Sequence, residues 1–341
     1  MENFFGNQPV SAALEDMVRR DRIPQTILLA GPAGVGKATL ARRFAAMLIG
    51  DAAKIEKDDM SLAEHQAMLA EREKLASDKR SADPLFLSTH PDFVTFPPDG
   101  PLRQISIQQM RVLKERAGFK PLRGSWRVFL IDGIDRAFEE SANSLLKTLE
   151  EPPAHLIIVM TAQNQYDLLP TIRSRAVQFQ MGRLQDDEMR AFAASRKIEQ
   201  VERRLALAAG SPGRAVSIDL ETYDRRRAAM LKLLEVGAGQ SPFAEWTKHS
   251  EYISLRKTEK LDYYLEVLYL LLEDVLMIQH RGDRLSNPDV QRQLEALAAR
   301  VPFRWIQAAV KRVDEMAELL RRNIQKSIAL DAFALELRSI C

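Results

Sequence analysis

The stretch TILLAGPAGVGKATLARRFAAML, residues 26–48, decides the fold of this chain. It begins as a short apolar run, passes through a glycine-rich loop and ends in a segment with helical spacing of apolar residues. A strand, a glycine loop and a helix in this order form a phosphate-binding loop, because backbone N–H groups at the helix start face an anion. Gly31, Gly34 and Gly36 supply the glycines, and Lys37 supplies a cation for the phosphates.

The loop departs from its motif at the position after the lysine. A Ser or Thr hydroxyl normally ligates magnesium there, and this chain has Ala38. Thr39 comes one residue late, which on a helix turns its side chain by about 100° from the metal position. We therefore expect magnesium to lose a protein ligand at this site.

A second strand, WRVFLIDGID at residues 126–135, carries the other half of a nucleotide site. In nucleotide-hydrolysing proteins an Asp at the end of such a strand holds magnesium, and a following Glu polarises the attacking water. Asp132 fits the first role, but Gly133 has no group for acid–base chemistry. Because magnesium ligation at Ala38 and water activation at Gly133 are both weakened, the sequence predicts a site that binds nucleotide better than it hydrolyses it.

The order of elements predicts the fold class. Strands alternate with helices from about residue 26 to 180, which indicates an α/β domain with a doubly wound parallel sheet. Beyond residue 183 only helical patterns follow. We predict a nucleotide-binding-like α/β domain at 1–183, a small helical lid domain at 184–238 and an all-α domain at 239–341. Within the first domain, the charged segment 50–83 is expected to be an exposed helical insertion or a flexible arm.

Composition narrows the class of protein. The chain has 341 residues, 46% of them hydrophobic, and a net charge of +2, which predicts a globular protein without a dominant nucleic-acid footprint. Its one cysteine, Cys341, allows neither an internal disulfide nor a thiolate zinc cluster, and the five histidines lack metal-ligand spacing. The N-terminal residues do not form a secretory signal and the longest apolar run carries three acidic residues, so we expect a cytoplasmic protein without a metal site.

Two segments carry arginines that are candidates for phosphate contacts. Arg173 and Arg175 lie in TIRSRAVQF, residues 171–179, between two apolar elements, and Arg214 follows the glycine turn in GSPGRAV, residues 210–216. An arginine at a subunit boundary can reach a neighbour's γ-phosphate and accelerate its transfer by ~10³–10⁵. Taken alone, each of these arginines is more often a solvated surface charge.

Taken together, the motifs resemble the bacterial clamp-loader ATPases of the AAA+ class, over residues 1 to about 215. The matching stretches are GNQPV at 6–10, GPAGVGKATLA at 31–41, FLIDGIDR at 129–136, ANSLLKTLEEPP at 142–153 and LLPTIRSRAVQF at 168–179. The resemblance implies an AAA+ fold with a helical lid and a C-terminal helical collar. Ala38 and Gly133 make the chain similar to the delta-prime type of DNA polymerase III clamp-loader subunit rather than to the gamma/tau motors.

The resemblance also assigns roles to single residues. Arg175 corresponds to the arginine finger offered to a neighbouring subunit's ATP, and Ser174 to the serine before it. Thr161 to Asn164 occupy the sensor position, and Arg214 occupies the position of the lid arginine. The degenerate nucleotide contacts are then Gly31, Gly34, Gly36, Lys37, Ala38, Thr39, Asp132, Asn164 and Arg214. The family's four-cysteine zinc module is replaced by the charged insertion at 50–90, so no zinc is expected.

The function implied by the resemblance is that of a stator, a subunit that supplies geometry and the finger but hydrolyses no ATP itself. Its partners would be gamma/tau motors and a delta subunit in a hetero-pentamer within the DNA polymerase III holoenzyme, with a sliding clamp and primed DNA. ATP or ADP would be bound without turnover, and magnesium would be poorly held. Three alternatives stay open: an active gamma/tau-type ATPase, an AAA+ scaffold outside replication, and an AAA+ helicase or recombination motor.

Overall fold

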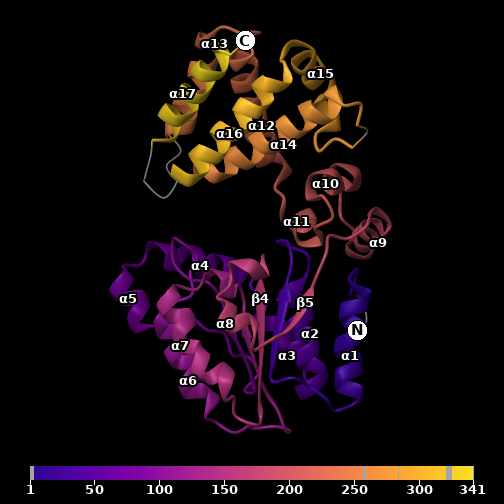
Figure 1. The fold of residues 1–341 in the computed structure, drawn as a ribbon, viewed down its shortest axis with the longest axis vertical. Helices are drawn as coiled ribbons and strands as arrows, with labels where there is room; N and C mark the ends of the chain where they lie inside the picture. The colour runs from indigo at the N-terminus through magenta and orange to yellow at the C-terminus, as the bar shows by residue number, and fades with distance from the viewer. Residues whose placement is uncertain (1–3, 256–258, 283, 320–324, 341) are drawn as a thin grey trace. The chain divides into compact units, whose positions relative to one another are not determined.

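The computed structural model describes residues 4–255, 259–282, 284–319 and 325–340, so Cys341 lies outside the described residues. The chain divides into two compact units, which are described separately (Figure 1). The first comprises Met1–Arg196 with Gly210–Gly213, and the second comprises Lys197–Ala209 with Arg214–Cys341.

The first unit is built on a parallel five-stranded sheet with the strand order β2-β3-β4-β1-β5. The predicted α/β class with a doubly wound parallel sheet is thereby confirmed. The strands are β1 Thr26–Ala30, β2 Phe93–Phe96, β3 Arg127–Ile131, β4 Leu156–Ala162 and β5 Val177–Gln180.

Helices cover both faces of the sheet, as Figure 1 shows. Helices α1 (Gln8–Arg19) and α2 (Lys37–Ile49) pack on one face, and α6 (Ile107–Ala117) and α7 (Glu139–Glu150) pack on the other. Successive strand residues point to opposite faces. In β1, for example, Leu28 lies in the core beneath α6 and α7, while its neighbours Ile27 and Leu29 lie in the core beneath α1 and α2. Since both faces are covered, the residues of the central strands β1, β3 and β4 are buried at every position and are mostly apolar.

Shorter elements complete the first unit. These are α3 Ala52–Ile55, η1 Glu56–Asp58, α4 Ala63–Lys74, α5 Ser77–Ala82, η2 Ile134–Arg136, η3 Gln165–Asp167, α8 Pro170–Arg173 and α9 Asp186–Arg196. At the start of α6, the Ser106 side chain accepts from the Gln109 backbone N–H and the Gln109 side chain accepts from the Ser106 N–H in return.

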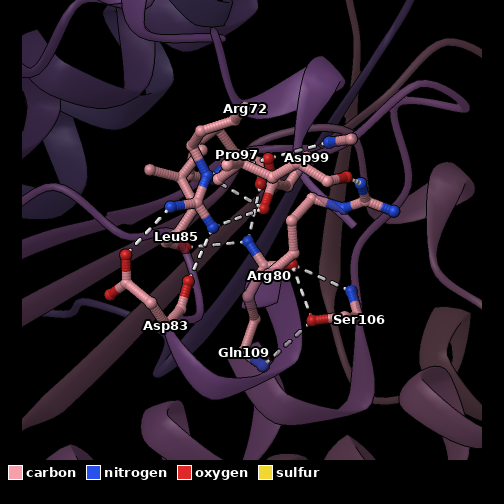
Figure 2. A network of polar contacts seen from close by, with 10 residues as sticks. Arg72, Arg80, Asp83, Leu85, Pro97, Asp99, Ser106 and Gln109 are labelled. Atoms are coloured by element: carbon pink, nitrogen blue, oxygen red, sulfur yellow. Dashed lines mark hydrogen bonds and ion pairs between the residues drawn. The ribbon is translucent and has the colours of Figure 1, made fainter. Parts of the chain in front are cut away.

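The charged insertion is helical and is tied to the sheet by one buried arginine, Arg72 of α4 (Figure 2). The Arg72 guanidinium donates to both carboxylate oxygens of Asp99, which follows β2, with Nε–Oδ1 at 3.0 Å and Nη2–Oδ2 at 2.7 Å. It also donates to the side chain and carbonyl of Asp83. Beside it, Gln109 donates to the carbonyls of Leu85 and Pro97. Of the two expectations for this segment, the structure therefore shows the ordered helical insertion.

The second unit is entirely helical within its described residues. Its elements are α10 Val201–Ala208, α11 Pro212–Ser217, α12 Leu220–Gly237, α13 Phe243–Leu255, α14 Leu261–Gln279, η4 Pro288–Val290, α15 Gln291–Arg300, α16 Phe303–Leu319 and α17 Lys326–Arg338. Helix α12 packs against α13, α14 and α17 around the buried Trp246 and Trp305. Across the described ranges, none of the helices combines the length and the apolar composition that crossing a membrane requires.

The packing of α12 differs from what the predicted boundary between the lid and the C-terminal domain implies. Its residues fall within the range 184–238 predicted for the lid, yet its apolar face lies in the same core as the C-terminal helices. The first four residues of the glycine turn, Gly210–Gly213, group instead with the sheet unit. The three-domain division stays a prediction, while the compact units divide the chain after Arg196, Ala209 and Gly213.

Candidate functional site

The glycine loop lies where the sequence places it, between β1 and α2. Gly34 and Gly36 have φ of 74° and 97°, in the left-handed region that glycine adopts without strain. Gly36 is the N-cap of α2, so the loop ends at a helix N-terminus. This backbone has the shape of an anion cradle.

Lys37 is turned onto its own loop. Its ammonium donates to the carbonyl oxygens of Gly31 at 2.6 Å and Pro32 at 2.7 Å. Burial lowers the pKa of the Lys37 ammonium, and the nearby carboxylates of Asp132 and Asp135 oppose that shift. Any phosphate in the loop therefore has to compete with two carbonyls for this cation.

The positions after the lysine offer no ready metal ligand. Ala38 is half-buried and packs against the core beneath α1 and α2. The Thr39 hydroxyl oxygen accepts from Nη2 of Arg42 at 3.5 Å. Arg42 is itself buried and paired with Glu56 of the insertion. The Thr39 hydroxyl thus faces along α2 toward the insertion.

Asp132 and the end of β4 do come together. The Thr161 hydroxyl donates to Oδ1 of Asp132 at 2.6 Å and accepts from the Gly133 N–H at 2.8 Å. Gly133 has φ 81° and ψ 53°, a left-handed conformation. A side chain at this position would be strained and would point toward Pro98, because a Cβ there would lie 3.5 Å from the Pro98 ring.

The predicted sensor residue Asn164 does not join this pair in the structure. Its Oδ1 accepts from the Tyr166 N–H and its amide donates to Asp167, so it caps the short helix η3. Thr161, the first residue of the predicted sensor segment, is the β4 residue that contacts Asp132.

A contact that sequence reasoning missed joins the loop to the glycine turn at 210–213. The Gly213 N–H donates to the Gly34 carbonyl at 2.8 Å, and the Ser211 hydroxyl donates to the Ala33 carbonyl at 3.0 Å. Arg214, the next residue, belongs to the second unit, where its guanidinium pairs with Glu266 of α14 at 2.6 Å.

The two candidate finger arginines have different surroundings. Arg173 stacks over the Tyr166 ring at 5.5 Å. Arg175 follows α8, and its Nη1 donates to the Thr171 carbonyl at 2.8 Å, while Nη2 pairs with Glu150 at the end of α7. The Ser174 hydroxyl donates to the same Thr171 carbonyl at 3.1 Å and so closes the α8 turn. Arg175 therefore sits on a fixed turn with 30% of its side chain exposed.

A metal site needs several His, Cys, Asp or Glu side chains that converge within the described ranges of the chain. No group of three or more His, Cys, Asp or Glu side chains in these ranges is placed to hold a metal ion. In the insertion, the acidic side chains of Glu56, Asp83 and the neighbouring Asp99 are paired with arginines. Ion pairs thus occupy these three carboxylates.

Comparison with known proteins supplies the family. The family model described as DNA polymerase III, delta subunit, matches residues 6–185, and the model for its C-terminal domain matches residues 245–338. DNA polymerase III subunit delta' of Pseudomonas aeruginosa is 30% identical over 229 residues, covering 64% of this chain and 64% of the relative. DNA polymerase III subunit gamma/tau of Mycobacterium tuberculosis is 29% identical over 189 residues, covering 55% of this chain and 30% of the relative.

These alignments cover less than two thirds of the length of either relative. Among solved structures, a gamma subunit-related protein of DNA polymerase III from Thermotoga maritima is 16% identical, with a TM-score of 0.48 over 96% of this chain and 98% of that one. The family model spans more than half of the chain, including the sheet, the glycine loop and the Arg175 turn. The chain therefore belongs to the DNA polymerase III delta subunit family and is homologous to the delta' and gamma/tau subunits of the bacterial clamp loader.

Proposed function

We propose that this chain is a delta-prime-type stator of the DNA polymerase III clamp loader. In this role it supplies Arg175 to the ATP site of an adjacent gamma/tau motor subunit and hydrolyses no ATP itself. The observation that carries the proposal is the turn after α8, where three contacts hold the part-exposed guanidinium of Arg175. Such a cation stabilises the charge that develops on a transferred phosphoryl group.

The proposed lack of turnover rests on the chain's own loop. Ala38 has no oxygen for magnesium, and Thr39 is engaged with Arg42. Gly133 has no side chain, so this position supplies no water-polarising carboxylate beside Asp132. An active motor of the gamma/tau type needs both functions, so these features favour the stator over that alternative.

We also propose that ATP or ADP, when held by this loop, is a structural element that is not turned over. The glycine cradle and the Lys37 ammonium fit the phosphates of such a ligand. The same residues do not fit magnesium. Binding of a fluorescent ADP analogue with and without magnesium tests this, and a Lys37→Ala variant is the control for loop binding.

The proposed partners follow from the family. The second unit would join gamma/tau and delta subunits in the collar of a hetero-pentamer, and the complex would open a ring-shaped sliding clamp and load it on primed DNA. Recovery of those subunits in a pull-down supports this assembly. Recovery of a partner outside replication favours the scaffold alternative instead.

The decisive experiment measures clamp- and DNA-stimulated ATP hydrolysis in a complex rebuilt with the motor subunits. We expect Arg175→Ala to lower turnover by at least ~10-fold, a conservative bound for a finger. Arg173→Ala is the matched control, since Arg173 stacks on Tyr166. The isolated chain should not hydrolyse ATP. Hydrolysis by the isolated chain, or an unchanged rate in the complex with Arg175→Ala, would contradict the proposal.

A further inference from the structure

The finger arginine has a carboxylate partner of its own, Glu150. The Glu150 Oε1 atom accepts from Nη2 of Arg175, so the two side chains form an ion pair between α7 and the turn after α8. The pair is open to solvent, with 30% of the Arg175 side chain and 46% of the Glu150 side chain exposed. An exposed pair of this kind adds little to stability, ~0–1 kcal/mol. Its position at the finger therefore points to a role other than holding the fold together.

Glu150 stands on a rigid base. It is the last residue of α7, and Leu149 before it is buried in the core beneath α6 and α7. After it, the double proline is fixed to the start of β1, because Gln25 donates to the Pro153 carbonyl at 2.8 Å. A carboxylate held from both sides can fix the direction of a flexible arginine.

The contacts leave donors free for a phosphate. A guanidinium carries five N–H donors. On Arg175, Nη1 donates to the Thr171 carbonyl and to the Ser174 hydroxyl at 3.4 Å, and Nη2 donates once to Glu150. Among the described contacts, Nε–H and the second Nη2 hydrogen stay available. These remaining N–H groups can donate to phosphate oxygens.

We propose that Glu150 is a positioning residue for the finger, which rests on the function proposed for Arg175. It holds the guanidinium in one orientation while the free donors face a neighbouring subunit's terminal phosphate. Without such a partner, the arginine side chain loses conformational freedom when it binds the phosphate. This loss lowers the fraction of molecules with the guanidinium in the orientation that contacts the phosphate by a factor of roughly 2 to 10. Glu150 offsets that loss before the phosphate arrives.

The test is ATP hydrolysis by the rebuilt complex, with clamp and primed DNA, as a double-mutant cycle. We expect Glu150→Ala to lower kcat roughly 2- to 10-fold with KM unchanged, because the finger acts on the transition state. Glu150→Gln keeps an acceptor for Nη2 and should recover part of the rate. In an Arg175→Ala background, Glu150→Ala should change nothing further, since its only route to the reaction is through the finger.

Glu151→Ala is the matched control, because it removes an exposed carboxylate from the neighbouring position and should leave kcat unchanged. Thermal melting of each variant checks the fold independently of activity. An unchanged or raised kcat with Glu150→Ala, or an equal loss in the Arg175→Ala background, overturns this inference alone. A full rate with Arg175→Ala overturns the proposed function, and the positioning role with it.

Discussion

Replacing Arg72 by Met tests whether one ion pair holds the charged insertion on the sheet unit. Only 10% of each side chain is exposed in the Arg72–Asp99 pair, and two short hydrogen bonds connect them. Methionine keeps most of the aliphatic volume and removes the charge. The Asp99 carboxylate then stays buried without its main counter-charge.

The expected loss in the free energy of unfolding follows from these contacts. Removing one partner of a buried pair costs ~3–5 kcal/mol. Asp99 retains one hydrogen bond, from the Gly100 N–H at 2.7 Å, which lowers the loss. The second pair of Arg72, to Asp83, adds little because 85% of the Asp83 side chain is exposed. We therefore expect a loss of about 2–4 kcal/mol in the free energy of unfolding.

Two measurements check this expectation. Urea denaturation gives the change in free energy, and hydrogen exchange shows whether residues 50–90 open before the sheet does. Lys74→Met is the matched control on the same helix, since Lys74 pairs with Glu71 and both are more than two thirds exposed. The double variant Arg72→Met/Asp99→Asn removes the orphaned charge and should recover part of the loss. If Arg72→Met behaves like Lys74→Met, the pair does not anchor the insertion.

Three further predictions concern single buried or strained positions. His90 is buried and burial lowers the pKa of its imidazole, so the unfolded state takes up the proton first as pH falls below about 6.5. Its contribution is present above that pH and is lost below it, and His90→Asn should flatten the stability curve between pH 5 and 6.5, measured by urea denaturation. Gly133→Glu should cost roughly 1–2 kcal/mol for its left-handed backbone and should not restore ATP hydrolysis, because the side chain points toward Pro98. Gly213→Ala should weaken the contact with the loop, since a Cβ there meets the Gly34 backbone at 3.0 Å, and exchange of the Gly213 amide reports the loss.

Each of these has an outcome that contradicts it. A pH profile of His90→Asn parallel to the wild type would assign the titration to another group. ATP turnover by Gly133→Glu would show that the backbone relaxes to aim the new carboxylate at the site. Unchanged protection of the Gly213 amide would show that the loop moves to accept the methyl group at no cost.

Local patterns along the chain were sufficient for most of the fold. Alternating strands and helices predicted the parallel sheet. The losses at Ala38 and Gly133 could also be recognised, because each concerns the chemistry of one side chain at a known place in a motif. For segment 50–83 the same approach left two outcomes open, since charge density describes neither packing nor order.

The sequence by itself determined the strand–loop–helix unit, the weakened loop chemistry and the candidate finger, because these depend on neighbours a few residues apart. The tertiary structure alone decided which charges are partnered: Arg72 with Asp99, 27 residues away, and Arg175 with Glu150, 25 residues away. It also decided that the Gly34 carbonyl meets the Gly213 amide. Such contacts depend on where packing brings distant segments together, and no local spacing encodes that geometry.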